Sequence, residues 1–482
     1  MHYRLVFQIL GKIIILIGLS MLLPLLVAFY FQEREWQAFA WSALITIAAG
    51  IPLSLYPSRN EELRRREGCA IVTLSWVAAA IFGSLPYLFS DAFPHFADAL
   101  FETVSGFTTT GASVMTDIES HSRSILFWRS LTHWLGGMGI VVLFVALLSH
   151  MGAGGLQMLQ AEAPGPVTEK IKPRIQETAK ILWSTYLILS VLEILLLWAA
   201  GLSLYEAVIH TFGTMATGGF SSKNASIGYY TSAAVQWIIT VFMFLAGINF
   251  ALYYQVLRRR SPLYFWRSPE FKLYSALIVI ATIIVAADLI LAGNRPGEHL
   301  VRTAAFQVVS IITTTGYVTA DYDAWPSLSR ALLFILMFIG GCYGSTGGAI
   351  KVGRWLVVLK NGLAELFRTI HPHALFPVRF GNTGVLKENL VLNILQFVCL
   401  YLLLFAAGTL AIAMTGLGLE DAASAAAATL GNVGPGLGAV GPAQNYAHLP
   451  VASKYLLSWL MLVGRLEIYT VLALFLRTTW RG

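Results

Sequence analysis

The amino-acid sequence predicts an all-α polytopic membrane protein with ten transmembrane helices, and three observations support this fold class. Hydrophobic residues make up 57% of the 482 residues and charged residues only 12%, with a mean hydropathy of +0.69. A soluble domain is far less apolar and carries about twice as many charges. Ten apolar runs are long enough to cross a bilayer as helices. Four shorter apolar segments each end at a glycine-containing motif.

The ten apolar runs are the predicted transmembrane helices. A membrane-spanning helix needs about twenty apolar residues. The first run is too long for the apolar core of a signal peptide and lacks a small-residue cleavage site, so we expect no cleavable signal. The runs cover residues 5–31, 37–57, 69–90, 124–150, 181–201, 232–257, 271–293, 328–359, 389–416 and 452–478.

Four shorter segments are predicted to enter the membrane and turn back without crossing it. They cover residues 96–108, 205–216, 298–314 and 420–431, and they are too short or too mixed in polarity to span. The first ends in the string Gly-Phe-Thr-Thr-Thr-Gly-Ala-Ser at 106–113, and a near copy of its core lies at 313–316. Looser relatives follow the other two segments, so a central glycine recurs about every hundred residues. These glycines are Gly111, Gly218, Gly316 and Gly434.

The recurring glycines divide the chain into four copies of span, short segment, glycine motif and span. Because the copies have the same orientation, we expect them to surround a central ion pore in a pseudo-fourfold arrangement. Two leading helices and a loop form residues 1–67. The predicted pore repeats are residues 68–152, 153–260, 261–370, whose second helix is interrupted, and 371–482.

The distribution of basic residues predicts the orientation of the chain. Most of its 32 lysine and arginine residues fall in the segments that are cytoplasmic if both termini are cytoplasmic. This is the bias that orients membrane proteins. The formal charge of +7 is therefore assigned to short loops at a membrane surface, and no binding of nucleic acid is predicted.

The glycine motifs have the composition of a cation site made from backbone carbonyl groups. Carbonyl oxygens replace the hydration shell of a cation without a full charge that would trap it. Glycine permits the backbone angles that such a segment needs. The preceding short helix directs the negative end of its dipole at the site, which favours cations. Acidic residues near the starts of these helices are interpreted as helix caps; they are Asp98, Glu206, Glu298, Glu420 and Asp421.

On these motifs the whole chain, residues 1–482, resembles the membrane subunit of bacterial Trk-type potassium uptake systems, in the superfamily of Trk, Ktr and plant HKT transporters. The resemblance implies a potassium selectivity filter with one glycine from each repeat, in a bacterial inner membrane. Serine often replaces the first glycine in sodium-preferring members, so glycine at 111 favours potassium. The implied filter residues are Thr109, Thr110, Gly111, Thr217, Gly218, Thr314, Thr315, Gly316, Asn432, Val433 and Gly434.

Two features could gate such a pore. The span 328–359 contains a glycine-rich interruption, and the resemblance implies that it is the intramembrane loop that obstructs the pore; a packed kink without moving parts is the alternative. The second feature is Arg465, a charge inside an apolar span. In the register of the return spans it aligns with Met138, Ile248 and Cys342, which favours the pore axis, while an ion pair with Glu193 is the alternative. The implied loop residues are Gly340, Gly341, Gly344, Ser345, Thr346, Gly347 and Gly348.

The resemblance also implies partners. Family members work with a cytosolic nucleotide-binding regulatory subunit, here expected at the basic segments 258–272 and 351–387, and are usually homodimers. Potassium is the only ligand expected on this chain, and no organic cofactor is predicted. Two other functions remain open: potassium symport coupled to sodium or protons, and a receptor or scaffold whose glycines only pack helices. No motif of the sequence predicts an enzyme.

Overall fold

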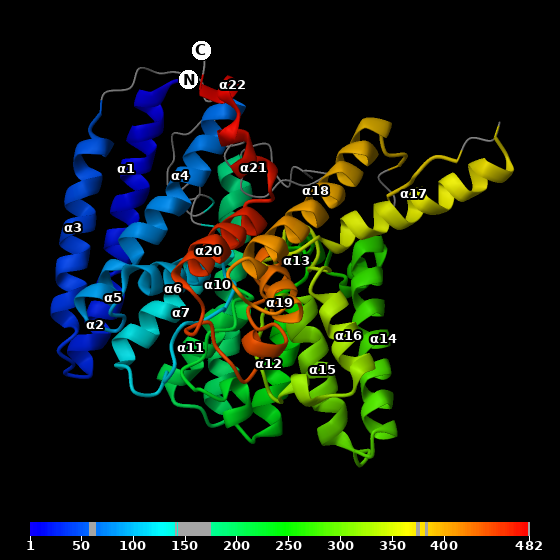
Figure 1. Cartoon of the computed structure of the whole chain (residues 1–482), viewed down its shortest axis with the longest axis horizontal. Helices are drawn as coiled ribbons and strands as arrows, with labels where there is room; N and C mark the ends of the chain where they lie inside the picture. Colours follow the sequence, from blue (N-terminus) through cyan, green and yellow to red (C-terminus); the bar gives the residue numbers. More distant parts are fainter. Residues whose placement is uncertain (57–63, 140–141, 143–174, 373–375, 381–383, 481–482) are drawn as a thin grey trace.

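The computed structural model describes residues 1–56, 64–139, 142, 175–372, 376–380 and 384–480. Over these residues the regular elements are helices, together with two isolated β-bridges. Both ends of the chain lie on the same side of the molecule (Figure 1). The predicted fold class, an all-α polytopic membrane protein, is confirmed.

Among the described residues, six helical stretches are long and apolar enough to cross a membrane, and each overlaps a predicted span. They are Tyr3–Tyr30, Trp36–Ser54, Arg66–Phe89, Glu177–Ala199, Pro269–Leu291 and Glu388–Ala413. The helices that form them are α1 (Tyr3–Ser20), α2 (Leu22–Tyr30), α3 (Trp36–Ser54), α4 (Arg65–Gly83), α5 (Leu85–Phe89), α10 (Ile175–Ala199), α14 (Pro269–Leu291) and α18 (Glu388–Ala413).

The four short segments are helices with nearly the predicted bounds. They are α6 (Phe96–Phe107), α11 (Leu204–Met215), α15 (Glu298–Ile312) and α19 (Leu419–Leu430). Each packs against a long helix before it and a helix after it, and the four lie in the interior of the molecule (Figure 1). Small residues allow this close packing in α19, which is rich in alanine. This organisation is the one expected for four related units.

Two of the helices that follow the short ones are bent, so the predicted spans 232–257 and 452–478 are not continuous straight helices. The run 232–257 consists of α12 (Ala233–Ala246) and α13 (Phe250–Arg259), which meet at 91°. The run 452–478 consists of α20 (Val451–Arg465) and α21 (Tyr469–Leu472), which bend by 111°, followed by a 3₁₀ turn (Ala473–Phe475) and α22 (Arg477–Trp480). The physical reason is the glycine near each break, since glycine disfavours a continuous helix. The hydropathy of each run remained high across the break.

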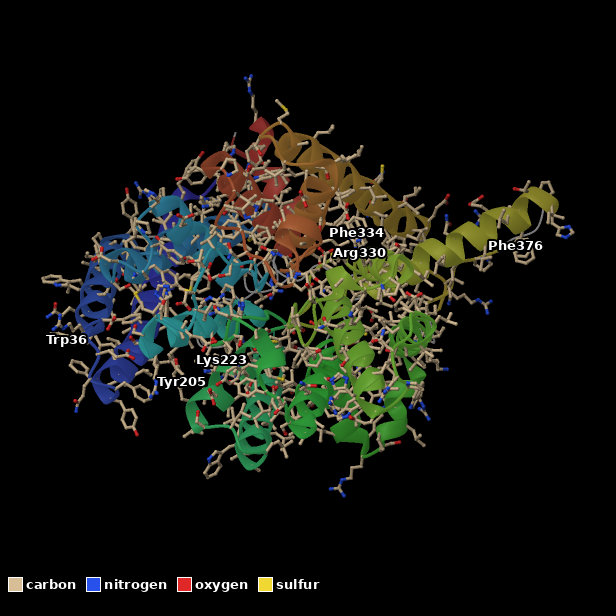
Figure 2. All side chains as sticks on the ribbon, turned by 60° about the horizontal axis from the view of Figure 1, so that its bottom comes forward. Trp36, Tyr205, Lys223, Arg330, Phe334 and Phe376 are labelled. Carbon is tan, nitrogen blue, oxygen red and sulfur yellow. The ribbon has the colours of Figure 1, made fainter. Side chains whose placement is uncertain are left out.

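The interruption in the third unit is confirmed. α16 (Ser327–Leu336) and α17 (Val352–Ile370) are separated by a non-helical stretch with a parallel bridge between Ile339 and Ile350. α17 extends away from the other helices (Figure 1). Phe376 lies at the far end of this arm (Figure 2), where its ring stacks on Phe367 with a centroid distance of 5.3 Å.

Two predictions fall partly outside the described residues. The helix α7 (Arg123–Gly137) forms the first part of the predicted span 124–150, and the rest of that span is not described. The predicted boundary between the first two pore repeats, at 152–153, is also not described. Four further 3₁₀ turns complete the described elements: Ser226–Tyr229, Pro262–Arg267, Tyr322–Ala324 and Gly438–Val440.

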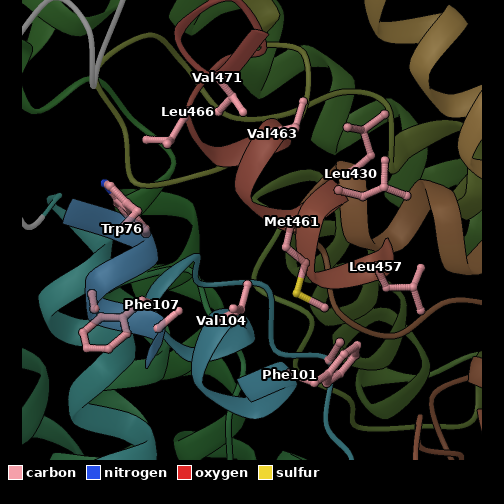
Figure 3. Packing of buried hydrophobic residues seen from close by; sticks show 14 of the residues in the cluster. Trp76, Phe101, Val104, Phe107, Leu430, Leu457, Met461, Val463, Leu466 and Val471 are labelled. Carbon is pink, nitrogen blue, oxygen red and sulfur yellow. The ribbon is translucent and has the colours of Figure 1, made fainter. Parts of the chain in front are cut away.

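The largest apolar core joins the first and last units. Phe101, Val104 and Phe107 on α6 lie in this core together with Leu457 and Met461 on α20, and the two helices pack against each other (Figure 3). All five side chains are at most 2% exposed. Burial of large apolar side chains stabilises this contact, since each contributes about 1.5–3 kcal/mol. The chain therefore closes on itself, with the last unit packed against the first.

Candidate functional site

The segments after the four short helices share one backbone conformation. In each, a residue with left-handed φ is followed two positions later by a glycine with positive φ. The first residues are Thr109 (φ 54°), Thr217 (53°), Thr314 (60°) and Asn432 (53°), and the glycines are Gly111 (80°), Gly219 (79°), Gly316 (77°) and Gly434 (99°). A β-branched residue in this region is strained by about 1–3 kcal/mol, and such strain is concentrated at functional sites.

This pattern corrects the predicted register in the second unit. The residue that matches Gly111, Gly316 and Gly434 is Gly219, whereas Gly218 matches Thr110. The hydrogen bonds agree, because the amide of Gly218 donates to Gly213 as the amide of Thr110 donates to Ser105. Because two glycines are adjacent here, the sequence alone left the alignment of this segment with the other three uncertain by one residue. The backbone angles resolve this ambiguity.

The four segments form a closed ring. A Cβ atom on Gly111 would overlap the carbonyl oxygen of Gly218. In the same way, Gly219 lies against the carbonyl of Thr315, Gly316 against that of Val433, and Gly434 against that of Thr110. The contacts thus run in cyclic order from the first unit to the fourth and back to the first. Glycine is required at these positions because any side chain would collide with the neighbouring segment.

Among the described residues, the carbonyl groups of this ring accept no hydrogen bond. Among the described residues, no amide or side chain donates a hydrogen bond to the carbonyl oxygens of Thr110, Gly218, Thr315 or Val433. Buried carbonyl groups nearly always have a partner, so four in one ring indicate a site for a ligand. Dipoles of this kind can coordinate a cation.

Threonine hydroxyls hydrogen-bond to each other within the first and third segments and so stabilise the ring, instead of all pointing to a ligand. The hydroxyls of Thr108 and Thr110 are 2.7 Å apart, and those of Thr313 and Thr315 are also 2.7 Å apart. The buried hydroxyl of Thr109 has no partner among the described residues. It is therefore the threonine oxygen of the first unit that remains available to a ligand.

The fourth segment, which departs most in sequence, is linked to the first by a side chain. The amide nitrogen of Asn432 donates to the hydroxyl of Thr110 (3.0 Å) and to the carbonyl of Met461 (2.9 Å). The ring is therefore closed by a hydrogen bond as well as by packing. Val433 stands where the first and third segments have threonine, and it still contributes its carbonyl to the ring.

Three polar residues inside the short helices hold the segments that leave the ring, and the sequence analysis did not identify them. Glu102 accepts hydrogen bonds from the hydroxyl of Ser113 (2.9 Å) and the amide of Val114 (2.8 Å). His210 bonds the hydroxyl of Ser221 at 3.1 Å, and Gln307 bonds that of Thr319 at 3.2 Å. These contacts fix the segments after the ring. An isolated polar residue in an apolar short helix was the signal that could have revealed them.

Glu102 is itself part of a buried ion pair that connects the first two units. Arg129 donates to Glu102 at 2.6 Å and to the carbonyl of Ser221 at 3.0 Å, and its guanidinium lies 3.5 Å from the centroid of the Phe220 ring. Both charged side chains are at most 2% exposed. Phe220 follows Gly219, so this arginine supports the ring from behind.

We expect Arg129→Ala to destabilise the protein strongly. Removal of one partner from a buried pair leaves an uncompensated charge and costs about 3–5 kcal/mol. The midpoint of thermal unfolding in detergent measures this loss. Arg330→Ala is the matched control, because Arg330 pairs with Asp323 and Glu420 at the surface and such pairs contribute at most about 1 kcal/mol. Equal midpoints for the two variants would contradict the assigned role of Arg129.

The interruption of the third unit lies directly against the ring. The amide of Gly348 donates to the hydroxyl of Thr314 at 2.7 Å. A Cβ atom on Gly348 would collide with the carbonyl of Gly431 and with Asn432. The predicted gate residues 340–348 are thus adjacent to the third and fourth ring segments.

The other end of this loop is joined to the break in the second unit. The amide of Cys342 donates to the carbonyl of Gly247 (2.8 Å), and the amide of Phe250 donates to the carbonyl of Gly344 (3.1 Å). Glu270 at the start of α14 accepts from the amide of Tyr343 at 2.7 Å. The loop is therefore held at defined points by hydrogen bonds.

Arg465 connects this loop to the first unit. Its guanidinium donates to the carbonyl of Thr346 at 2.5 Å and to the carbonyls of Gly136 and Gly137 at 2.8 and 2.7 Å. Glu467 is paired with Arg354 instead. Neither carboxylate oxygen of Glu193 has a hydrogen-bond partner among the described residues, so the alternative of an Arg465–Glu193 pair is not observed.

The register assumed for Arg465 also needs a correction. Gly136 lies against the carbonyl of Phe107, and Gly464 lies against the equivalent carbonyl of Leu430. The residue of the first unit that corresponds to Arg465 is therefore Gly137, not Met138. The two adjacent glycines at 136 and 137 caused this shift by one position.

The acidic residues at the starts of the short helices are engaged by neighbouring cations. Asp98 pairs with Lys454 at 2.6 Å, Glu420 with Arg330 at 2.8 Å, and Glu298 with Arg302. This supports their interpretation as structural groups. In the loop after the first ring segment, the Asn224 amide donates to Asp117 at 3.0 Å, and this hydrogen bond lowers the pKa of the Asp117 carboxyl.

The fold and the ring together define a polytopic membrane protein of the transport class. The chain belongs to the TrkH family: the family model, described as "Cation transport protein", matches residues 35–479. The resemblance to Trk-type proteins is thereby confirmed. The family consists of transport proteins rather than enzymes, as expected.

Similar proteins cover the chain from end to end. The Trk system potassium uptake protein TrkH of Salmonella typhimurium is 41% identical over 489 residues, which cover 100% of both chains. The protein TrkG of Escherichia coli K12 is 33% identical and covers 100% of this chain and 99% of its own length. The crystal structure of the potassium transporter TrkH from Vibrio parahaemolyticus superposes with a TM-score of 0.90 at 36% identity, over 100% of each chain.

Proposed function

We propose that this chain mediates potassium uptake through a selective pore whose filter is the ring described above. The observation that supports this proposal best is the closed ring of four carbonyl groups that accept no hydrogen bond from the described residues. Such a ring can replace the hydration shell of a potassium ion. The names of the full-length relatives describe potassium uptake, which agrees with this substrate.

The proposed filter consists of the strained residues, the carbonyl-bearing residues that follow them and the glycines. Gly219 joins the residues expected from the sequence. The C-terminal ends of α6, α11, α15 and α19 lead directly into the ring, so their partial negative charges favour a cation there. The full set is Thr109, Thr110, Gly111, Thr217, Gly218, Gly219, Thr314, Thr315, Gly316, Asn432, Val433 and Gly434.

The proposed gate consists of the loop 340–348 and Arg465. The loop contacts the ring through Gly348, and Arg465 holds the carbonyl of Thr346 from the opposite side. A fixed positive charge next to the ion path hinders the passage of a cation. Movement of the loop away from Arg465 would open the path.

The remaining proposals concern the setting of this pore. We place the chain in a bacterial inner membrane with both termini in the cytoplasm, which agrees with the position of both ends on one side (Figure 1) and with the basic loops. A cytosolic nucleotide-binding subunit is proposed to control the gate from the segments 258–272 and 351–387, of which 373–375 and 381–383 are not described. A homodimer is the proposed assembly.

Ion flux with the purified chain tests the function. The protein is reconstituted in liposomes, and the uptake of potassium, of rubidium and of sodium is measured separately. We expect uptake of potassium and rubidium to exceed that of sodium. Liposomes without protein are the control. Equal uptake of all three ions, or no uptake, would contradict the proposal.

A further inference from the structure

Glu193 is a buried carboxyl group that the proposed pore does not use. It lies on α10, in the membrane, and is 0% exposed. Neither of its oxygens has a hydrogen-bond partner among the described residues. An ionised carboxylate in such a place is very unfavourable, so the position of this group needs an explanation.

The neighbouring polar group is the hydroxyl of Thr214 on α11. Thr214 already donates its only hydroxyl proton to the carbonyl of His210 at 2.8 Å. It can therefore offer only a lone pair to Glu193. A carboxylate is solely an acceptor and would be repelled by this lone pair, whereas a protonated carboxyl can donate to it.

Among the residues that the structure describes, the other ionisable groups near Glu193 do not supply a compensating charge. Neither α11 nor α12, which pack against α10, contains a lysine or an arginine. Tyr186 on α10 donates to the carbonyl of Trp134 (3.1 Å), and Tyr253 on α13 donates to that of Leu245 (2.7 Å). Both tyrosines are thus engaged elsewhere.

The remaining neighbours are engaged in the same way. The imidazole of His210 bonds the carbonyl of Glu206 (2.8 Å) and the hydroxyl of Ser221 (3.1 Å). Arg129 on the adjacent α7 pairs with Glu102. The arginines of α13 lie in its last turn, where the guanidinium of Arg259 is 4.6 Å from the centroid of the Tyr264 ring.

Glu193 lies beside a hydrogen-bond network that reaches the back of the ring. Thr214 belongs to the last turn of α11, just before the strained Thr217. The carbonyl of His210 also accepts from the hydroxyl of Tyr317 at 3.0 Å, and that hydroxyl lies 3.1 Å from the carbonyl of Phe220. Tyr317 follows Gly316, and Phe220 follows Gly219. The network therefore runs from Thr214, beside Glu193, to two of the four ring segments.

We propose that Glu193 is a proton-binding site behind the ring, and that cation flux through the ring requires its bound proton. The neutral carboxyl donates to Thr214 and leaves the Thr214–His210–Tyr317 network intact. When the proton is released to water, the carboxylate opposes the Thr214 lone pair and places a negative charge behind two ring segments. The ring is then distorted and holds the cation more tightly, so flux falls.

Infrared spectroscopy tests the protonation directly and does not depend on the proposed potassium transport. The spectrum of the wild-type protein minus that of Glu193→Gln, both at neutral pH, is expected to show the carbonyl stretch of a carboxylic acid. If the difference spectrum shows only carboxylate bands, the proposal is wrong. Ser190→Ala, one turn away on α10, is the control that should retain the acid band.

Rubidium flux at neutral and alkaline pH tests the coupling and rests on the proposed function. Wild-type flux is expected to fall by about tenfold at alkaline pH, since buried carboxyls without a counter-charge lose their protons in that range. Glu193→Gln carries an amide that can also donate to Thr214, so its flux should equal wild-type flux at neutral pH and persist at alkaline pH. Ser190→Ala should keep the wild-type pH profile.

Three outcomes would overturn the proposal. One is wild-type flux that does not change with pH. Another is a Glu193→Gln variant that is monodisperse but has lost neutral-pH flux, because ionised Glu193 would then be required. The third is a sodium dependence of flux that disappears in Glu193→Gln, which would indicate a metal-cation site instead of a proton site. Absence of flux in every sample would contradict the proposed function and leave the infrared result to decide on Glu193.

Discussion

Replacement of Gly316 by serine is expected to lower the potassium-to-sodium selectivity of the pore by about tenfold or more, which corresponds to about 1.4 kcal/mol. A side chain at this position would collide with the carbonyl oxygen of Val433 and would have to occupy a left-handed backbone conformation. The serine would thus displace a carbonyl group that we assign to the cation site. The ratio of rubidium to sodium uptake in liposomes measures the effect.

The same variant at Gly219 tests the corrected register. Gly219→Ser is expected to reduce selectivity as much as Gly316→Ser, because it collides with the carbonyl of Thr315. A side chain at Gly218 would instead contact the imidazole of His133, which lies behind the ring of carbonyl groups. Selectivity changes at 219 and 316 would therefore support the equivalence of these two positions.

A matched control separates the collision from backbone strain. Gly293 also has a positive φ, of 95°, but a Cβ atom there would meet no heavy atom within 4 Å. Gly293→Ser thus has a similar backbone cost, of about 1 kcal/mol, without a displaced carbonyl, and should retain wild-type selectivity. Unchanged selectivity in both Gly219→Ser and Gly316→Ser would contradict the assignment of the ring as the selectivity filter.

Arg465→Ala is expected to raise cation flux in the absence of a regulatory partner by about tenfold or more. A unit positive charge about 4 Å from a cation raises the energy of that cation by about 4 kcal/mol at an effective dielectric constant of about 20. The alanine variant removes this charge and also the hydrogen bonds to Thr346, Gly136 and Gly137. Both changes favour an open path.

Arg465→Lys separates the two contributions. Lysine keeps the charge, but its single ammonium group cannot reproduce the planar set of donors that arginine directs at three carbonyls. Low flux in the lysine variant would assign the barrier to the charge, and high flux would assign it to the hydrogen bonds that hold the loop. An alanine variant no more permeable than wild type would show that Arg465 has only a structural role.

The positions of the short helices could be predicted because each depends on local sequence. A run such as 205–216 is too short to span and ends at a glycine motif, and the structure places α11 at Leu204–Met215. The family could be predicted for a related reason, since the repeated motifs are distinctive as a set. Charge and hydropathy were sufficient for the fold class.

The details that the sequence did not reveal depend on contacts between distant segments. The sequence does not show which of Gly218 and Gly219 corresponds to Gly111. The answer depends on the backbone angles and on the neighbouring segment that each α-carbon contacts. The bend after Ala246 is stabilised by Asn249, which caps α13 through the amide of Ala251 (2.9 Å), and by the loop of the third unit. The partners of Arg465 are backbone carbonyls, which have no signature in sequence.

The most direct test of the central claim is anomalous X-ray scattering from crystals of the protein grown in rubidium. The proposed filter predicts an anomalous density peak inside the ring, between the carbonyl groups of Thr110, Gly218, Thr315 and Val433. A rubidium peak elsewhere in the membrane region, with none inside this ring, would contradict the assignment of these residues as the cation site.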